Sequence, residues 1–342
     1  MKKPRWVGNE RVVVFRTEDI AQLVMATPAL RAIREALPDG QITLLTSHTA
    51  AGLAPCLEGV DEVIPFTTLW ADRRGELAFD PEREEGFVEE LRGGKYAAAI
   101  ILNNQTQSSL PAAYACYMAG IPLRLARSAE VAGSLLTHRV RGFGEGHEIE
   151  RCLEVVGTWG FDTSDKAPSL VTPPKVRATV DLLLKNHGVA GRPYVVVHGS
   201  PEAGRSDATI KAFARAITEL ADRFGYLTLM TGLPDERLAI QWVAGEAGTP
   251  SLVIAGETSV AELATVIEGA AIVVAANASP AHIASAYGVP SMLICEGTRP
   301  PAQWLPWGRS VAVDAGDATL GEQLTELLGV GGGAALAPAA AV

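Results

Sequence analysis

The stretch Arg11–Thr46, RVVVFRTEDIAQLVMATPALRAIREALPDGQITLLT, decides the fold class of this chain. It opens with the short β-branched run Arg11–Phe15, and a polar loop leads into an amphipathic stretch that predicts a helix over Leu23–Leu37. That stretch carries Pro28 in its first turns and is followed by the apolar run Gln41–Thr46. Continuous apolar runs bounded by turn residues are typical of strands buried on both faces of a parallel sheet. We therefore expect a strand–helix–strand unit of an α/β fold.

The same alternation extends over most of the chain. Further strands are expected over residues 62–66, 97–102, 194–198, 226–231, 251–255, 271–276 and 291–295, and helices over 81–92, 210–224, 260–268 and 281–287, with another from 235. The pattern breaks over 124–165, and the three prolines of Lys166–Lys175 indicate a linker. This predicts two doubly wound Rossmann-like domains facing a cleft, over 1–170 and 171–330, and a disordered tail over 331–342.

The composition argues against several classes of protein. The 342 residues carry 29 Lys and Arg against 39 Asp and Glu, and the formal net charge of −10 counts against nucleic-acid binding. No apolar run is long enough for a spanning helix, and the four cysteines are scattered singly, as in reduced cytoplasmic proteins. The sequence holds no GxxxxGK[ST] loop, no GxSxG elbow and no His/Cys cluster typical of metal sites. We therefore expect neither a metal nor a resident cofactor.

Polar residues follow the expected strands of the second half. Ser200 and Arg205 lie in the turn after the first of these strands, where backbone N–H groups, a hydroxyl and a guanidinium suit a phosphate. The next strand ends at Thr231, and Gly232 then lets the backbone approach a ligand. Glu236, at a helix start, suits a ribose diol or a helix cap. Taken alone, each of these features is more typical of an ordinary loop or a helix cap than of a ligand site.

A third strand is followed by Asn277, Ser279, Pro280 and His282. Asn277 and Ser279 are polar residues at the carboxyl end of the strand, and Pro280 suits the first position of a helix. His282 falls in the first turn of that helix, where a lone histidine is more often structural. Because the carboxyl ends of parallel strands meet at one edge of a sheet, the three polar strand ends together predict a nucleotide-type site.

In the first half, Glu18 and Asp19 lie in the loop after Arg11–Phe15. Either carboxylate is a candidate general base, provided that it reaches a substrate hydroxyl. Solvated loop acids without a catalytic role explain the same residues equally well.

The stretch quoted first resembles the opening of glycosyltransferase family 9, the heptosyltransferase family. In that family a strand, an Arg or Lys, a short loop and a Gly-Asp pair precede a helix that contains T-P-A-L. The runs VVVHGSPEAGR, LMTGLPDE and NASPAHIASAYGVPSMLICEG resemble the family's C-terminal motifs in order and spacing. The similarity covers roughly residues 11–310, and it rests on this ordered succession rather than on one motif.

The resemblance implies a GT-B fold, with an acceptor-binding N-terminal domain and a C-terminal domain that binds a nucleotide sugar. Family members transfer a heptose from ADP-heptose to an acceptor hydroxyl with inversion and without a metal. By position, the family's roles fall as follows: diphosphate binding on Ser200 and Arg205, the ribose contact on Glu236, the sugar contact on Asn277, the phosphate-facing Gly-Pro turn on Ser279 and Pro280, and the helix histidine on His282.

Four positions depart from the family pattern. The Gly-Asp pair, whose Asp is the proposed base, is Ala21-Gln22 here, and Asn277 and Ser279 replace an Asp and a Gly. A neutral amide such as that of Gln22 cannot accept a proton at pH 7. Three explanations remain open: Glu18 or Asp19 is a relocated base, the acceptor needs little base assistance, or the chain binds without turnover. The missing Asp also hints at a donor sugar other than the usual heptose.

The sequence thus predicts an inverting, metal-independent glycosyltransferase that moves a heptose-like sugar from a nucleoside-diphosphate donor, ADP-linked, to a glycan or small-molecule acceptor. The alternative is a catalytically impaired homologue that binds nucleotide sugars or glycans, as a partner of an active enzyme. A third reading, an epimerase of the same architecture, fits poorly with the missing acids. We expect a cytoplasmic protein with at most peripheral contact with the inner membrane, since the acidic total weakens docking on anionic lipid.

Overall fold

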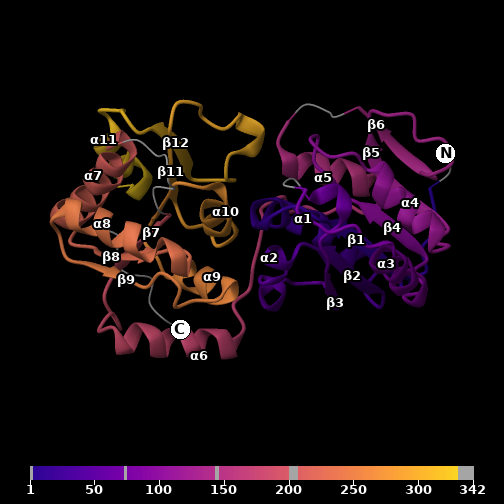
Figure 1. Ribbon diagram of the computed structural model, residues 1–342, viewed down its shortest axis with the longest axis horizontal. Coiled ribbons are helices and arrows are strands. Elements are labelled where there is room, and N and C mark those ends of the chain that lie inside the picture. The colour runs from indigo at the N-terminus through magenta and orange to yellow at the C-terminus, as the bar shows by residue number, and fades with distance from the viewer. Residues whose placement is uncertain (1–2, 73–74, 143–145, 200–206, 330–342) are drawn as a thin grey trace. The chain divides into compact units, whose positions relative to one another are not determined.

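The computed structural model describes residues 3–72, 75–142, 146–199 and 207–329. It divides into two compact units, Met1–Ser169 and Leu170–Val342 (Figure 1). Each unit has its own parallel sheet and its own hydrophobic core. The tail expected over 331–342 lies outside the described residues.

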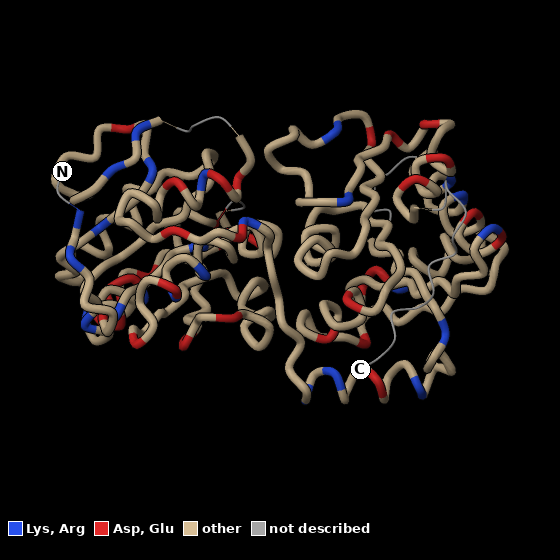
Figure 2. Tube along the Cα trace, turned by 180° about the vertical axis from the view of Figure 1, so that it is seen from behind, with Lys and Arg blue, Asp and Glu red and all other residues tan. Residues whose placement is uncertain are grey.

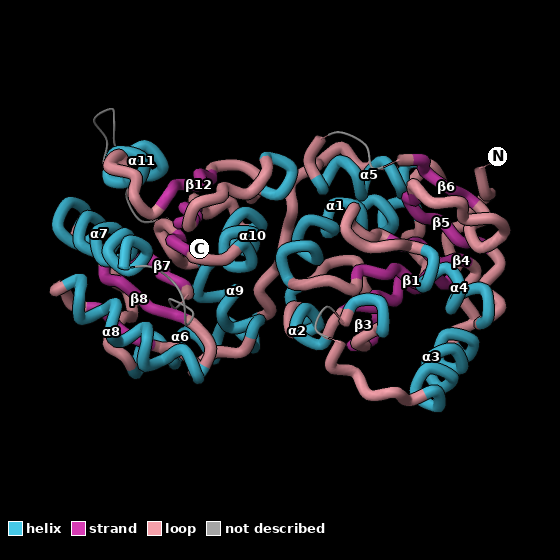
Figure 3. Tube along the Cα trace, turned by 45° about the horizontal axis from the view of Figure 1, so that its top comes forward, coloured by secondary structure: helices cyan, strands magenta, loops and turns pink. Residues whose placement is uncertain are grey.

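The sheet of the first unit has six parallel strands in the order β3-β2-β1-β4-β5-β6. The strands are β1 (Arg11–Arg16), β2 (Gln41–Thr46), β3 (Glu62–Pro65), β4 (Ala98–Ile101), β5 (Leu123–Ser128) and β6 (His138–Arg141). The helices are α1 (Ile20–Ala36), α2 (His48–Ala51), α3 (Pro81–Gly93), α4 (Leu110–Met118) and α5 (Glu148–Gly157), with the 3₁₀ turns η1 (Ala54–Cys56) and η2 (Leu69–Ala71). They flank the sheet, as Figure 3 shows. The strand order reverses between β1 and β4, and open α/β sheets bind ligands at such a switch point.

Helix α1 follows the loop after β1, and most of its residues are buried in the core. It begins three residues earlier than predicted, because Asp19 caps it by accepting the N–H groups of Ala21 and Gln22. Pro28 lies inside the helix and cannot donate to the carbonyl of Val24. The Thr27 hydroxyl donates to that carbonyl instead, at 2.8 Å. The helix therefore continues through its proline, and it packs against α5.

The second unit repeats this plan. Its parallel strands are β7 (Tyr194–His198), β8 (Leu227–Thr231), β9 (Ser251–Val253), β10 (Val273–Ala275), β11 (Ser291–Cys295) and β12 (Ser310–Asp314). Its helices are α6 (Pro174–Asn186), α7 (Asp207–Phe224), α8 (Arg237–Ala247), α9 (Val260–Glu268), α10 (Ala278–Ala286) and α11 (Leu320–Leu328), with the turns η3 (Pro234–Glu236) and η4 (Ala302–Trp304). The order β12-β11-β10-β7-β8-β9 is that of the first sheet when counted from β7, so the switch point lies between β7 and β10.

Several predicted elements are confirmed to the residue, namely the strands over 41–46, 194–198 and 291–295 and the helix over 260–268. The expected break over 124–165 was wrong, because β5, β6 and α5 occupy that region. Strand β5 was missed because two of its buried residues, Arg124 and Arg127, are charged. The Arg124 guanidinium donates to backbone carbonyls, including that of Leu135 at 2.7 Å, so a charged side chain is held inside a buried strand.

Two prolines also lie elsewhere than expected. Helix α10 begins at Ala278, so Pro280 is its third residue and not its first. Pro280 is tolerated there because the N–H groups of the first turn have no intrahelical partner. Pro174, which was assigned to the linker, is the first residue of α6.

Acidic and basic residues occur together throughout each unit (Figure 2). Within the part of the chain that the structure describes, no helix is long and apolar enough to cross a membrane.

Candidate functional site

The switch point of the first sheet gathers charged side chains. Glu18 follows β1, and its Oε1 accepts the backbone N–H of Asn104, which follows β4, at 2.9 Å. This bond ties together the two strand ends between which the sheet order reverses. Among the described residues, the other oxygen of Glu18, Oε2, is buried without a hydrogen-bond partner. The loop is therefore pinned at the point where a ligand of this fold is expected.

Asp19 is exposed beside this buried loop. Its Oδ1 accepts the N–H groups of Ala21 at 2.9 Å and Gln22 at 3.3 Å. With its amide nitrogen turned toward Asp19, the Gln22 side chain donates to Oδ2 at 3.0 Å. The structure thus brings the side chains of Asp19 and Gln22 together at the start of α1.

Glu18 has a different environment, because it is paired with a buried arginine. Arg16, 1% exposed, ends β1, and its Nη1 lies 3.6 Å from Glu18 Oε1. Its Nη2 donates to Glu148 Oε1 at 2.9 Å. Burial by itself lowers the pKa of Arg16, but the charges of Glu18 and of Glu148 on α5 raise it, to a net value above the ordinary one. Arg16 therefore remains charged and holds two carboxylates.

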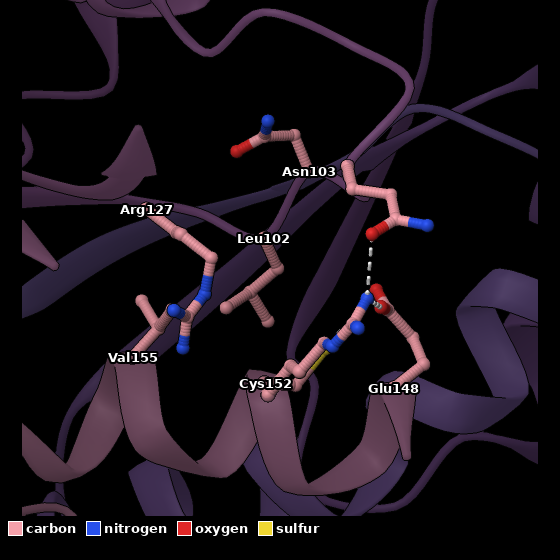
Figure 4. A pocket seen from close by; sticks show the side chains of 8 residues that line it. Leu102, Asn103, Arg127, Glu148, Cys152 and Val155 are labelled. Atoms are coloured by element: carbon pink, nitrogen blue, oxygen red, sulfur yellow. Dashed lines mark hydrogen bonds and ion pairs between the residues drawn. The ribbon is translucent and has the colours of Figure 1, made fainter. Parts of the chain in front are cut away.

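A small pocket lies next to Glu148, with room for little more than a water molecule (Figure 4). Gln105 lines it from the loop after β4, Arg127 from β5, and Glu148 and Arg151 from α5. Arg151 donates to Gln105 Oε1 at 3.2 Å and lies 3.9 Å from Glu148 Oε2. Arg127 forms an ion pair with Glu154. Each arginine therefore faces a carboxylate, which leaves the pocket polar without a strong excess of positive charge.

Among the described residues, the ends of β7, β8 and β10 carry uncharged polar groups. His198 ends β7 and its Nδ1 lies 2.9 Å from the hydroxyl of Thr231, which ends β8. Burial lowers the pKa of His198 to about 4, so the ring is neutral near pH 7. Gly199 follows with a φ of +110°, a conformation that strains other residues, and its absent Cβ would lie 3.1 Å from the Cβ of Ala276. The ends of β7, β8 and β10 are therefore closely packed.

Gly232 and Glu236 form a tight turn after β8. The Oε2 of Glu236 accepts the N–H of Leu233 at 2.6 Å, which caps the turn. A Cβ on Gly232 would lie 2.8 Å from that same oxygen and 2.5 Å from the Cδ1 of Ile240. Glu236 therefore has the capping role that the sequence offered as one explanation, while its ribose contact stays a prediction.

The third strand end leads into α10. Asn277 is exposed at the N-cap, and within the described chain its side chain makes no capping hydrogen bond. Ser279 is half-buried and Pro280 is buried in the first turn. His282, 1% exposed, has Nε2 placed 3.2 Å from the carbonyl of Trp304. Asn277 and Ser279 are thus accessible to a ligand, and His282 supports the helix from inside.

Two predicted donor-binding residues, Ser200 and Arg205, lie outside the described residues. Over the described ranges there is no group of three or more His, Cys, Asp or Glu residues that could hold a metal ion. The expected absence of a metal therefore stays a prediction for the chain as a whole.

The sequence model of glycosyltransferase family 9 (heptosyltransferase) matches residues 86–319. The chain belongs to this family. Lipopolysaccharide heptosyltransferase 3 of Escherichia coli is 23% identical to this family 9 chain over 310 residues, which cover 84% of each protein. The matched range begins after α1, so the replacement of Gly-Asp by Ala21-Gln22 stays a feature of the sequence comparison alone.

Solved structures share the fold of this family 9 chain. A family 9 glycosyl transferase from Veillonella parvula superposes with a TM-score of 0.74 at 19% identity, over 89% of this chain and 86% of its own. Escherichia coli heptosyltransferase WaaC, solved with ADP-2-deoxy-2-fluoro heptose, superposes with a TM-score of 0.68 at 16% identity, over 94% and 100%. The predicted GT-B architecture of two Rossmann-like units is confirmed.

Sequence reasoning did not single out Glu148 or His198. A charged Arg16 at the end of a buried strand requires a partner, but the sequence alone does not indicate which of 39 acidic residues supplies it. His198 was read only as the end of a strand. In the structure, β7 and β8 pair His198 directly with Thr231. Both residues are polar and each ends its strand, and this common position is the signal that could have indicated the pair.

Proposed function

We propose that this chain is an inverting, metal-independent glycosyltransferase that moves a heptose-like sugar from an ADP-linked donor to a hydroxyl of a glycan or small-molecule acceptor. Membership of family 9 supports the reaction class. One structural observation supports an active acceptor side: Asp19 is an exposed carboxylate at the switch point of the first sheet, beside Gln22.

In this proposal Asp19 is the general base. Its carboxylate accepts the proton of the acceptor hydroxyl while that oxygen attacks the anomeric carbon of the donor. The bond from that carbon to the diphosphate breaks, the diphosphate leaves with the electron pair, and the configuration inverts. We prefer Asp19 to Glu18 because the Glu18 side chain is only 1% exposed and is paired with Arg16. Gln22 would orient Asp19 rather than accept a proton.

The second unit would hold the donor. By resemblance, Ser200 and Arg205 would bind the diphosphate, and the N–H groups at the start of α10 would add donors for the departing oxygen. Thr231 and Gly232 would line the path of the nucleotide. Glu236 would use the oxygen that does not cap its turn to accept the ribose hydroxyls.

The start of α10 would face the transferred sugar and its phosphate. Asn277 would contact the sugar as a neutral donor and acceptor, Ser279 and Pro280 would shape the phosphate-facing turn, and His282 would support it from within. An Asn at the sugar contact would tolerate a different pattern of hydroxyls from an Asp, since its amide both donates and accepts.

A second function has a specific observation in its favour. Gln22 and Asn277 are both neutral amides where the family has carboxylates. A homologue that binds nucleotide sugars without turnover, as the partner of an active enzyme, would need neither carboxylate. We place the protein in the cytoplasm under either function, because none of its four cysteines forms a disulfide. Its contact with the membrane would be at most peripheral, since a formal net charge of −10 weakens docking on anionic lipid.

Titration calorimetry with ADP, UDP and GDP tests the donor site first. We expect micromolar binding of ADP that weakens at least tenfold in Arg205→Ala. Arg223→Ala is the matched control, because Arg223 is exposed on α7 and pairs only weakly with Glu219. Failure of all three nucleotides to bind would remove the donor-site assignment. Nucleotide binding without turnover of any ADP-, UDP- or GDP-sugar would favour the second function.

A further inference from the structure

Arg16 connects its own strand, β1, with three other segments of the first unit. Its Nε donates to the carbonyl of Gln22 in α1 at 2.9 Å, and its Nη1 donates to the carbonyl of Leu102 after β4. Its Nη2 donates to Glu148 at the start of α5. The guanidinium is planar and rigid, so fixing one of these bonds fixes the direction of the others.

Glu148 is the closer of the two carboxylate partners of Arg16. Its Oε1 lies 2.9 Å from Nη2, whereas Glu18 lies 3.6 Å from Nη1. The Glu148 side chain is 2% exposed, and as the first residue of α5 its negative charge is favoured by the helix dipole. Its second oxygen faces Arg151 at 3.9 Å. Glu148 is therefore held from two sides, by Arg16 and by Arg151.

This division of contacts leaves Glu18 available for another task. Its Oε1 accepts the N–H of Asn104 at 2.9 Å and thereby fixes the loop that leads to Asp19. Without the charge of Glu148, Arg16 would have one carboxylate left, and the attraction would draw it toward Glu18. That movement would pull on the Gln22 carbonyl and on the loop between them.

We propose that Glu148 is a positioning residue for the acceptor side: by holding Arg16, it fixes the loop that presents Asp19. This inference rests on the proposed function, because it matters for turnover only if Asp19 is the base. A displacement of a catalytic group by about 1 Å costs on the order of 100-fold in rate, so a remote carboxylate that sets this geometry has a large effect.

The test compares Glu148→Gln with Glu150→Gln. Gln keeps the shape of the side chain and an oxygen that can accept from Arg16, and it removes only the charge. Glu150 is the matched control, because it lies on the same helix, is exposed, and pairs with Lys166 at 3.2 Å on the surface. We expect kcat to fall at least tenfold in Glu148→Gln while the donor KM stays within about twofold, and neither value to change in Glu150→Gln.

Hydrogen–deuterium exchange gives a readout that does not depend on turnover. We expect the peptide over residues 16–23 to exchange at least threefold faster in Glu148→Gln than in the unaltered protein, and unchanged exchange for residues 260–268 of the second unit. If Glu148→Gln does not fold, Glu148→Asp keeps the charge with a shorter reach. It should show faster exchange over residues 16–23 than the unaltered protein, by less than is expected for Glu148→Gln, and a correspondingly smaller fall in kcat.

Three results would overturn the proposal. One is unchanged exchange over residues 16–23 in Glu148→Gln, or in Glu148→Asp if it has to be used. Another is a fall in kcat matched by an equal rise in donor KM and faster exchange in both units, which would indicate a general structural role. The third is a normal kcat in Glu148→Gln when Asp19→Asn is inactive. An active Asp19→Asn would instead show that Asp19 is not the base. This variant therefore distinguishes a failure of the proposed function from a failure of the Glu148 proposal.

Discussion

The two sheets have the same strand order, yet the described residues at the ends of their central strands differ in charge. In the first unit, the ends of β1 and β4 meet around a buried arginine with two carboxylates and an exposed aspartate. In the second, the ends of β7, β8 and β10 carry a neutral histidine, a threonine and an asparagine. One topology therefore supports two electrostatic environments.

The difference follows from what each side would bind in the proposed reaction. An anionic diphosphate is repelled by carboxylates and attracted by helix N-termini and neutral donors, which the second unit supplies. A neutral hydroxyl that must lose its proton needs a carboxylate, which the first unit supplies. Strand order alone fixes where a site lies, and the residues at the strand ends decide its chemistry.

The largest effect is expected from Asp19→Asn. Asn caps a helix as well as Asp does, so α1 should keep its stability while the proton acceptor is lost. We expect kcat to fall by about 100- to 10,000-fold, the usual contribution of a general base. Steady-state kinetics with an ADP-sugar donor measures it, with the thermal midpoint as the check on folding.

Glu18→Gln is the comparison variant for this loop. It should reduce kcat by about tenfold only, since the Gln oxygen can still accept the N–H of Asn104 and the loop stays in place. An inactive Glu18→Gln beside an active Asp19→Asn would reverse the two roles and make the buried carboxylate the base.

The proposed nucleotide site of the second unit is tested by Gly232→Ala. The new Cβ would lie 2.8 Å from Glu236 Oε2 and 2.5 Å from Ile240 Cδ1, so the turn that carries Glu236 must move. We expect nucleotide binding to weaken about tenfold, which corresponds to about 1.4 kcal/mol. Gly245→Ala in α8 is the control, because a Cβ there meets nothing within 4 Å and nucleotide affinity should not change. Equal affinities in both variants would mean that this turn does not contact the nucleotide.

The neutral state of His198 predicts a pH dependence of stability. Its pKa is about 4 in the folded chain and near the ordinary 6.5 when unfolded, so between these values the unfolded chain binds more protons. Stability is therefore lost as the pH falls from 6.5 toward 4, by about 2 kcal/mol at pH 5. Urea unfolding at pH 7 and pH 5 should show that this loss disappears in His198→Gln and persists in His48→Gln, an exposed control. An equal loss in His198→Gln would show that other groups cause it.

The sequence predicted the sheet strands well because apolar runs such as 194–198 have few alternatives in a buried parallel sheet. It failed at β5, where Arg124 is buried with its guanidinium bonded to backbone carbonyls and Arg127 is buried in an ion pair with Glu154. The candidate site was predictable only in part for the same reason. Glu18 and Asp19 could be found as acids after a strand. The contact between Arg16 and Glu148 at the same switch point could not, because it joins residues that are 132 positions apart.

The smallest expected effect is a change in the free energy of unfolding, and it concerns the prolines in α1 and α10. Pro280 lies in the first turn of α10, where a missing N–H leaves no carbonyl without a partner. Pro28 lies inside α1, where the carbonyl of Val24 would lack a donor without the Thr27 hydroxyl. Thr27→Val should therefore cost about 1 kcal/mol in the free energy of unfolding.

A double variant decides whether the proline is the reason for that cost. In Thr27→Val with Pro28→Ala, the restored N–H of Ala can donate to the Val24 carbonyl, so most of the lost stability should return. The Thr27 hydroxyl also accepts the N–H of Ser169 at 3.1 Å, and this bond stays broken in both variants. If the double variant recovered nothing in urea unfolding, the threonine would be needed for the Ser169 contact and not for the proline in α1.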